Sequence, residues 1–392
     1  MDSTALSSAI APASAGGEVR AARLDLVLLT AVVAVALAVG WLAASAAAGE
    51  IPAQNAMFDA DTGRVLGNLT GVSDNYYRLK VHPWQGWICI FYQQVVAHLL
   101  PPQLGVPLLS VAIAAACAGL VFVVLRRLDV DRWSAASHAV LFCSTAGYVF
   151  WSTLPESHMA GGVSTLAAVL LADERRRVPG WRTVAALAVS FSMVVTNAAV
   201  WLFQQAAFEP RAPAARLVRL MGWSVGLIVL VWAPQWLFLR KRIGIPFNFL
   251  EERHYVEVGS GTWNSSLHIF GIVPPDSGAA LVLALVAVAV LIVALRLLPA
   301  KLWFVPLFPL FGVVLHAVYG SESSFLFAPN YLPLFVVALA LVMARKLPRA
   351  ASLAVLPVAA LLLMFNLQQW QAHINTLQAS GQMKSYAAAV HY

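Results

Sequence analysis

The residues best placed to do chemistry lie in a polar segment, 49–84, where two carboxylates precede a basic group. The acids are Asp59 and Asp61, and the basic side chains that follow them are Arg78, Lys80 and His82. A carboxylate can accept a proton from an acceptor hydroxyl, while cations stabilise the charge that builds on a departing phosphate. This order favours group transfer from a phosphate-linked donor. The alternative is a solvated loop whose charges balance each other.

A second candidate is the sequence Leu-Pro-Glu-Ser-His, which ends at His158 and contains Glu156. It falls at the outer end of an expected membrane span, where a carboxylate is costly unless it is paired or used. We expect Glu156 and His158 to orient an acceptor hydroxyl or to hold the loop that carries Asp61. The alternative is a helix N-cap, in which Glu156 or Ser157 bonds to free backbone amides.

Two later loops add candidates for ligand binding. The loop 240–276 opens with three cations suited to a carrier phosphate at the bilayer surface, Arg240, Lys241 and Arg242. The segment 321–331 offers side chains that can bond to sugar hydroxyls, namely Glu322, Asn330 and Tyr331. The alternatives are an ordinary solvated connection for the first loop and an interfacial aromatic belt for the second.

No metal site is predicted from the sequence. The three cysteines, Cys89, Cys117 and Cys143, lie in or beside apolar segments, and no His, Cys or Asp cluster has metal-ligand spacing. A divalent cation such as Mg²⁺ or Mn²⁺ between Asp61 and Glu156 is compatible with their chemistry, but nothing requires it.

The elements that must position these residues are membrane helices. Hydrophobic residues make up 60% of the 392 residues and charged residues 11%, whereas soluble domains are about 45–50% apolar and about 25% charged. The mean hydropathy is +0.76. Basic residues, which give a net charge of +7, sit at the ends of apolar runs. They are better explained by orientation in a bilayer than by nucleic-acid binding.

The apolar runs predict an all-α polytopic membrane protein with about 11 crossings. Residues 1–25 are expected to be a cytoplasmic tail, 26–366 the membrane domain, and 367–392 a periplasmic tail. Expected spans include 134–152, 351–366 and a broken hairpin over 183–206, whereas 85–100 is expected to be a re-entrant or interfacial helix. Arg240–Arg242 then fall outside against the positive-inside rule, so either the topology shifts there or the group serves a ligand.

The polar segment 49–84, which we call the first loop, resembles the GT-C class of membrane glycosyltransferases. It is nearest to the lipid A aminoarabinose transferases and protein O-mannosyltransferases. The resemblance rests on Asp61-Thr-Gly-Arg64 and Lys80-Val-His-Pro83, within about 50 residues, and on the layout of many spans with polar loops on the outer face. Thr62 stands where those families usually have a second acid, and Trp84 follows a single proline.

The resemblance implies inverting transfer of a sugar from a polyprenyl-phosphate donor to a lipid, glycan or protein acceptor. It implies that Asp61 is the base or orients the acceptor, with Asp59 as the alternative base, and that Lys80 and Arg78 lie at the donor phosphate. We expect Arg64 to bind the donor as well. The Ala-rich composition is typical of bacteria, so we expect an inner-membrane protein whose active site faces the periplasm. The main alternative is a transporter or flippase for a lipid-linked or anionic substrate, although no internal repeat supports one.

Overall fold

The computed structural model describes most of the chain. The described residues are 15–58, 60–73, 75–76, 79, 82–171, 180–211, 214–239, 242–243, 266–318, 324–348 and 353–389. Among the candidates named above, Asp59, Arg78, Lys80, Arg240, Lys241 and Glu322 lie outside these residues.

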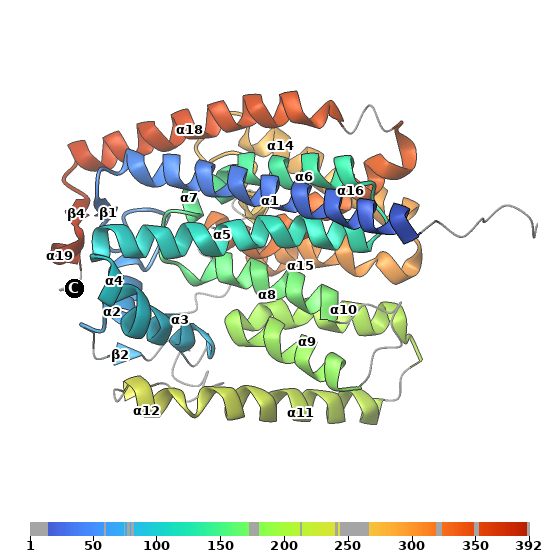
Figure 1. The fold of residues 1–392 in the computed structure, drawn as a ribbon, viewed down its shortest axis with the longest axis horizontal. Helices are drawn as coiled ribbons and strands as arrows, with labels where there is room; N and C mark the ends of the chain where they lie inside the picture. Colours follow the sequence, from blue (N-terminus) through green and yellow to red (C-terminus); the bar gives the residue numbers. More distant parts are fainter. Residues whose placement is uncertain are drawn as a thin grey trace, which may run out of the picture.

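The described residues form a bundle of long helices with their axes roughly side by side (Figure 1), which confirms the all-α class. At its centre α5 (Pro102–Arg127) packs against α1 (Ala15–Ala46), α6 (Arg132–Ser144) and α8 (Ser157–Leu171). Helix α16 (Ala328–Lys346) packs against α6 and α8. It also packs against α14 (Ala280–Leu297) and α15 (Phe304–Val318).

Five helices are long and apolar enough to cross a membrane, counting the described residues only. They lie within 21–46, 102–127, 214–239, 280–297 and 324–346, and α8 and α15 are shorter apolar helices. Large apolar side chains are exposed on α11 (Ala214–Trp232) and α14, such as Trp223 at 67% and Val282 at 62%. Such surfaces suit a lipid environment. The prediction of 11 crossings and their sidedness stays a prediction.

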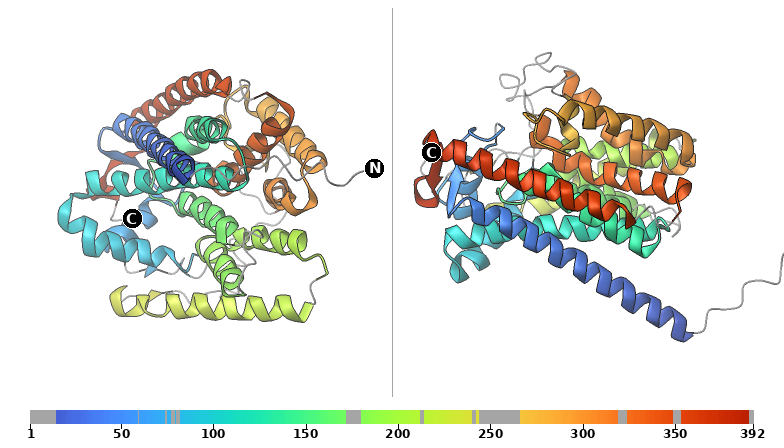
Figure 2. Two further views of the ribbon diagram at one scale, coloured as in Figure 1. Left: turned by 45° about the vertical axis from the view of Figure 1, so that its right-hand side comes forward. Right: turned by 90° about the horizontal axis from the view of Figure 1, so that it is seen from above.

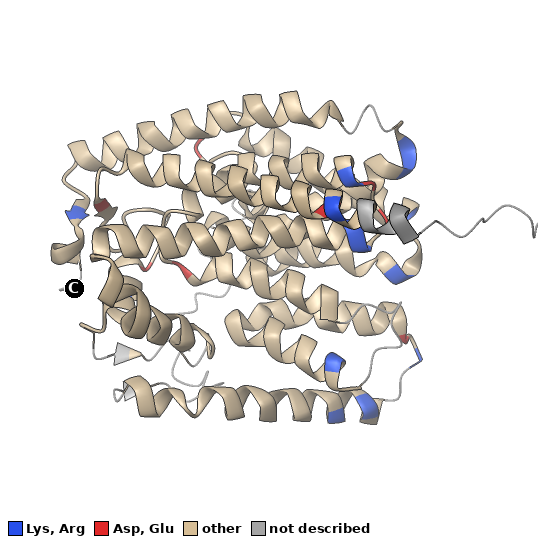
Figure 3. Ribbon diagram, viewed as in Figure 1, with Lys and Arg blue, Asp and Glu red and all other residues tan. Residues whose placement is uncertain are grey.

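Charge separates the two ends of the bundle (Figure 3). Most of the described Lys and Arg residues gather at the end where α1 begins, whereas α2, the helix that Asp61 precedes, lies at the other end (Figure 1). At the basic end Arg126 and Arg132 bond to Asp25, with N···O distances of 3.0 and 3.4 Å. The positive-inside rule makes this basic end the expected cytoplasmic end.

The span expected over 134–152 is two helices. Helix α6 ends at Ser144, and the short α7 (Ala146–Trp151) starts after Thr145, whose hydroxyl accepts from the backbone N–H of Tyr148. The backbone groups released at this break are bonded elsewhere. The side chain of Asn366 donates to the carbonyls of Ser144 and Ile272, at 2.8 and 2.9 Å. A buried amide thus replaces the missing helical bonds.

The hairpin expected over 183–206 is confirmed. Helix α9 (Gly180–Met193) ends before a single 3₁₀ turn, Val195–Asn197, and α10 (Ala198–Phe208) returns alongside it. The indole of Trp201 donates to the carbonyl of Thr183 at 3.1 Å, which joins the two arms.

The expected helix at 85–100 is present as one continuous helical segment. It consists of α3 (Gln85–Phe91), a π-helical turn (Tyr92–Val96) and α4 (Ala97–Leu99), and it stops before the two prolines. The Trp87 indole bonds to the carbonyl of Val231 on α11 at 2.9 Å. Its depth in a bilayer stays a prediction.

The C-terminal residues differ from the tail expected over 367–392. Helix α18 (Val355–Ala379) runs on past the expected end of the span at 366, and the Trp370 indole bonds to the carbonyl of Ala43. Strand β4 (Met383–Ser385) then pairs antiparallel with β1 (Glu50–Pro52), and α19 (Tyr386–Ala389) packs on the first loop. Helix α19 therefore lies beside the start of the first loop, at the end of the bundle opposite the start of α1 (Figure 2).

Candidate functional site

Asp61 lies at the start of α2 (Thr62–Thr70), the helix within the first loop. The Thr62 hydroxyl donates to the carbonyl of Pro52 at 2.9 Å, which fixes the helix start against β1. Both carboxylate oxygens of Asp61 are bonded, Oδ1 to Gln54 Nε2 at 2.7 Å and Oδ2 to Arg64 Nη2 at 2.5 Å. Gln54 Oε1 accepts from the backbone N–H of Arg64 at 3.2 Å, which closes a ring of three residues. We call Gln54, Asp61, Arg64 and Glu156 the carboxylate cluster.

Glu156 is the second acid of this cluster and immediately precedes α8. Its Oε2 accepts from the backbone N–H of Ser157 at 3.3 Å, as in the N-cap alternative. Its Oε1 is buried and makes no hydrogen bond. Burial raises the pKa of Glu156 from 4.5 to about 7; the charge of Arg64 opposes this shift and the charge of Asp61 adds to it.

A narrow cavity of about 20 Å³ adjoins Glu156, lined by α2, α3, α5 and the start of α8. It is large enough for about one water molecule, which needs at least about 10–15 Å³. Its wall includes Gln85 and Ser110, and the remaining lining is largely apolar. An acceptor could therefore approach Glu156 only if neighbouring side chains move.

The two acids have different environments, which is how paired carboxylates acquire separate roles. Asp61 is held by Arg64 and Gln54, whereas Glu156 has one buried oxygen without a hydrogen bond and a pKa near neutrality. A group with a pKa close to the working pH is the better general base. Glu156 can therefore take a proton, and Asp61 can orient Arg64.

Histidine and asparagine side chains form a second polar group beside the first. His158, on the first turn of α8, has its Nδ1 3.2 Å from Asn330 Nδ2, and Asn197 Nδ2 donates to Asn330 Oδ1 at 3.3 Å. The ring of His82 lies edge-on to that of His158, with centroids 6.3 Å apart, and His82 Nδ1 is 2.5 Å from the carbonyl of Met193. Three predicted residues, His82, His158 and Asn330, are thus brought together.

Two glycines on α8 allow this meeting. A Cβ at Gly161 would collide with Asn330 Oδ1, and one at Gly162 would collide with the carbonyl of Pro329. Small residues permit such close helix approach within membranes. Tyr331, the neighbour of Asn330, is buried in an aromatic contact with Phe308, with ring centroids 5.0 Å apart. Asn330 and Tyr331, predicted to act together, therefore have different surroundings.

The segments expected to hold the donor phosphate lie side by side. Strand β2 (Asn75–Tyr76) pairs in parallel with β3 (Arg242–Ile243), with Asn75 opposite Arg242. Leu79 is buried against the start of α3, and Gln235, on α12 (Gln235–Leu239), donates to the carbonyl of Pro83 at 2.7 Å. The backbone therefore brings the first loop to the beginning of the 240–276 loop.

Sequence reasoning missed Gln54, which bonds to Asp61 from seven positions earlier. Nothing in its local sequence distinguishes it from a solvated glutamine, because its role depends on the turn between β1 and α2. Asn197, in the turn between α9 and α10, donates to the carbonyl of Gly161 at 3.0 Å. It also belongs to the histidine–asparagine group.

The described residues contain no group of three or more His, Cys, Asp or Glu side chains able to hold a metal ion. Around Glu156, the neighbouring acid is already paired with an arginine. Comparison with known proteins gives no further assignment, since the chain matches no protein-family model and no curated protein sequence.

Proposed function

We propose that this chain is a membrane glycosyltransferase of the GT-C type, which transfers a sugar from a polyprenyl-phosphate carrier to a lipid, glycan or protein acceptor. The proposal places the enzyme in a bacterial inner membrane with the carboxylate cluster toward the periplasm. It combines the resemblance of the first loop with the geometry of its acids.

The observation that carries the proposal is the environment of Glu156. A buried carboxylate with a pKa of about 7 stands beside an Asp61–Arg64 ion pair, at the end of an apolar helical bundle. Strongly perturbed carboxylates of this kind cluster at functional sites, because burial costs stability unless the group is used.

In the proposed reaction Glu156 accepts the proton of the acceptor hydroxyl. The acceptor oxygen forms a bond to the anomeric carbon from the face opposite the phosphate, so the configuration inverts. The bond between the anomeric carbon and the phosphate oxygen breaks, and polyprenyl phosphate leaves with the electron pair. Arg64 supplies positive charge near the reacting centre, and Asp61 fixes its orientation.

The donor phosphate is proposed to lie where the first loop meets the 240–276 loop. The pairing of β2 with β3 supports this location, because it places Asn75 of the first loop opposite Arg242 at the start of the 240–276 loop. His158 is close to the carboxylate cluster, since it is two residues after Glu156, and its ring contacts that of His82 from the first loop.

The test is an assay of the purified chain in detergent with radiolabelled polyprenyl-phosphate sugars, comparing wild type, Asp61→Asn and Glu50→Gln. Glu50, a half-buried acid on β1 whose carboxylate accepts from Gln378 and which lies outside the cluster, is the control. We expect wild type and Glu50→Gln to release carrier phosphate and Asp61→Asn to lose that release while still binding carrier.

Full transfer by Asp61→Asn would remove Asp61 from the mechanism. No turnover with any donor, together with carrier binding by the wild type, would contradict the transferase and favour the transporter or flippase.

A further inference from the structure

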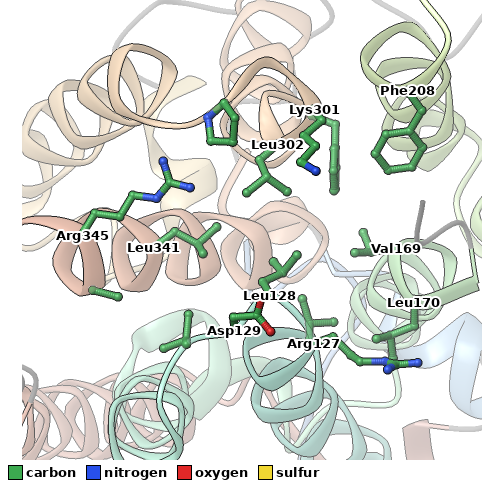
Figure 4. A pocket seen from close by; sticks show the side chains of 15 residues that line it. Arg127, Leu128, Asp129, Val169, Leu170, Phe208, Lys301, Leu302, Leu341 and Arg345 are labelled. Atoms are coloured by element: carbon green, nitrogen blue, oxygen red, sulfur yellow. The ribbon is translucent and has the colours of Figure 1, made fainter. Parts of the chain in front are cut away.

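A second and larger cavity, of about 300 Å³, lies at the basic end of the bundle (Figure 4). Its walls come from the ends of α5, α8, α10 and α16 and from the turn 299–304. Ser110 lines the cavity beside Glu156 and Arg127 lines this one. At 1.5 Å per residue, α5 therefore separates the two by about 25 Å. The larger cavity is thus not part of the carboxylate cluster.

Cations dominate its rim. Arg127, Lys301 and Arg345 line the cavity together with a single acid, Asp129, and Figure 4 shows that these residues come from three separate segments. Arg345 uses one N–H donor on the carbonyl of Leu297, at 2.7 Å. That bond holds the guanidinium at the rim. A guanidinium has five N–H donors in a planar arrangement, and this arrangement is suited to binding two phosphate oxygens at once.

The turn that carries Asp129 is fixed independently of any ligand. Asp129 has a left-handed φ of 63°, so the chain reverses directly after α5. Arg126 holds this turn by donating to the carbonyl of Val130 at 2.7 Å while also bonding to Asp25. The turn that places Asp129 at the rim is therefore held by Arg126, which does not itself line the cavity.

The interior below the rim is apolar. Its lining includes Val124, Val169, Phe208, Leu302, Phe304 and Leu341. The volume is at the lower limit of small-molecule sites, which are typically about 300–1,000 Å³. A ligand that fits both parts carries an anionic group on an apolar or weakly polar stem. Three cations against one carboxylate match a phosphate, which carries about one to two negative charges.

We propose that this cavity binds a phosphate-bearing anionic group, supplied either by the headgroup of an anionic phospholipid or by a soluble phosphate ester. Basic pockets between membrane helices on the cytoplasmic side are suited to such headgroups. This inference does not depend on the proposed transferase activity, and it concerns the opposite end of the molecule.

The experiment compares two double variants of the full chain purified in detergent. Lys301→Ala/Arg345→Ala removes two rim cations, and Arg296→Ala/Lys346→Ala removes two basic residues of the same end that do not line the cavity. Both lower the net charge equally, so bulk electrostatic attraction is matched. Native mass spectrometry measures binding of dioleoylphosphatidylglycerol, with dioleoylphosphatidylcholine as the zwitterionic comparison, and thermal unfolding with millimolar inorganic phosphate tests the free anion.

We expect wild type and Arg296→Ala/Lys346→Ala to bind phosphatidylglycerol equally, and Lys301→Ala/Arg345→Ala to lose about tenfold or more in affinity. Phosphatidylglycerol binding that phosphate does not compete with assigns a lipid, whereas stabilisation by phosphate alone assigns a soluble ester. An equal loss in both double variants, or no selective binding of any anion by wild type, would overturn the proposal. Unchanged unfolding temperatures without ligand verify that each variant is folded.

Discussion

The two ends of the bundle differ in how charged side chains are packed within an apolar protein. At the carboxylate cluster, acids and one arginine are packed together with a cavity of about 20 Å³, and one carboxylate oxygen is left without a hydrogen bond. At the basic end, three cations surround a cavity of about 300 Å³ and share it with one acid. The tight end shifts a pKa, which suits chemistry, and the open end keeps charges beside accessible volume, which suits binding.

The largest expected effect is on the rate of sugar transfer, and it distinguishes Glu156 of the carboxylate cluster from Asp129 of the basic end. Glu156→Gln should lower sugar transfer by about 10²–10⁴-fold, the usual contribution of a general base, whereas Asp129→Asn should leave it within about twofold. The wild-type rate should rise with pH and level off above about 7, where Glu156 is ionised. A rate assay from pH 5 to pH 9 measures the loss in each variant and the pH dependence of the wild type. Equal losses in Glu156→Gln and Asp129→Asn would contradict a specific role for Glu156.

The second effect is on stability as a function of pH. In the unfolded chain Glu156 releases its proton near pH 4.5, but in the folded chain only near pH 7. Between these values the folded state binds more protons, so stability falls as pH rises, by at most about 3 kcal/mol. Glu156→Gln should flatten this fall and be the more stable protein at pH 8.

The matched control for this titration is Glu209→Gln, an acid paired with Arg216 and 40% exposed. It should keep the wild-type slope of unfolding temperature between pH 5 and pH 8. A flattened slope in this control as well would show that the titration does not belong to Glu156.

The smallest expected effect is on the free energy of unfolding when one ion pair is removed from each end of the bundle. Arg64→Met removes the Arg64–Asp61 ion pair at the carboxylate cluster and should reduce the free energy of unfolding by about 1–2 kcal/mol. Arg132→Met should cost less than about 1 kcal/mol, because Asp25 keeps its bond to Arg126. Denaturant unfolding in detergent measures both; a larger loss for Arg132→Met would reverse the contrast.

Much of the fold could be predicted from the sequence, because apolar runs bounded by arginines specify membrane helices directly. The broken hairpin over 183–206 and the helix at 85–100 were also predicted, since proline and polar residues interrupt such runs recognisably. The break at Thr145 was not, because the bonds that replace its helical bonds come from Asn366 and from the turn at Gly271. Those partners are distant in the sequence.

The candidate site was predicted in composition but not in geometry. The residue types of Asp61, Arg64 and Glu156 indicated chemistry, yet the division of roles depends on Gln54 and on the burial of Glu156. The meeting of His158 with Asn330 depends on the small size of Gly161 and Gly162. A local sequence pattern does not show which helices will be in contact. Small residues such as these glycines only allow two helices to approach closely.

The pairing of β1 with β4 links the assembly of the carboxylate cluster to the timing of protein synthesis. The segment that carries Asp61 is synthesised soon after β1, whereas the partner strand of β1, Met383–Ser385, follows α18 in the chain, and Ala389 packs close to Gly63. Until then β1 has an open edge. A nascent chain, or one truncated before Met383, therefore lacks the strand that closes the loop, so the cluster is completed only after the helices of the bundle have been synthesised.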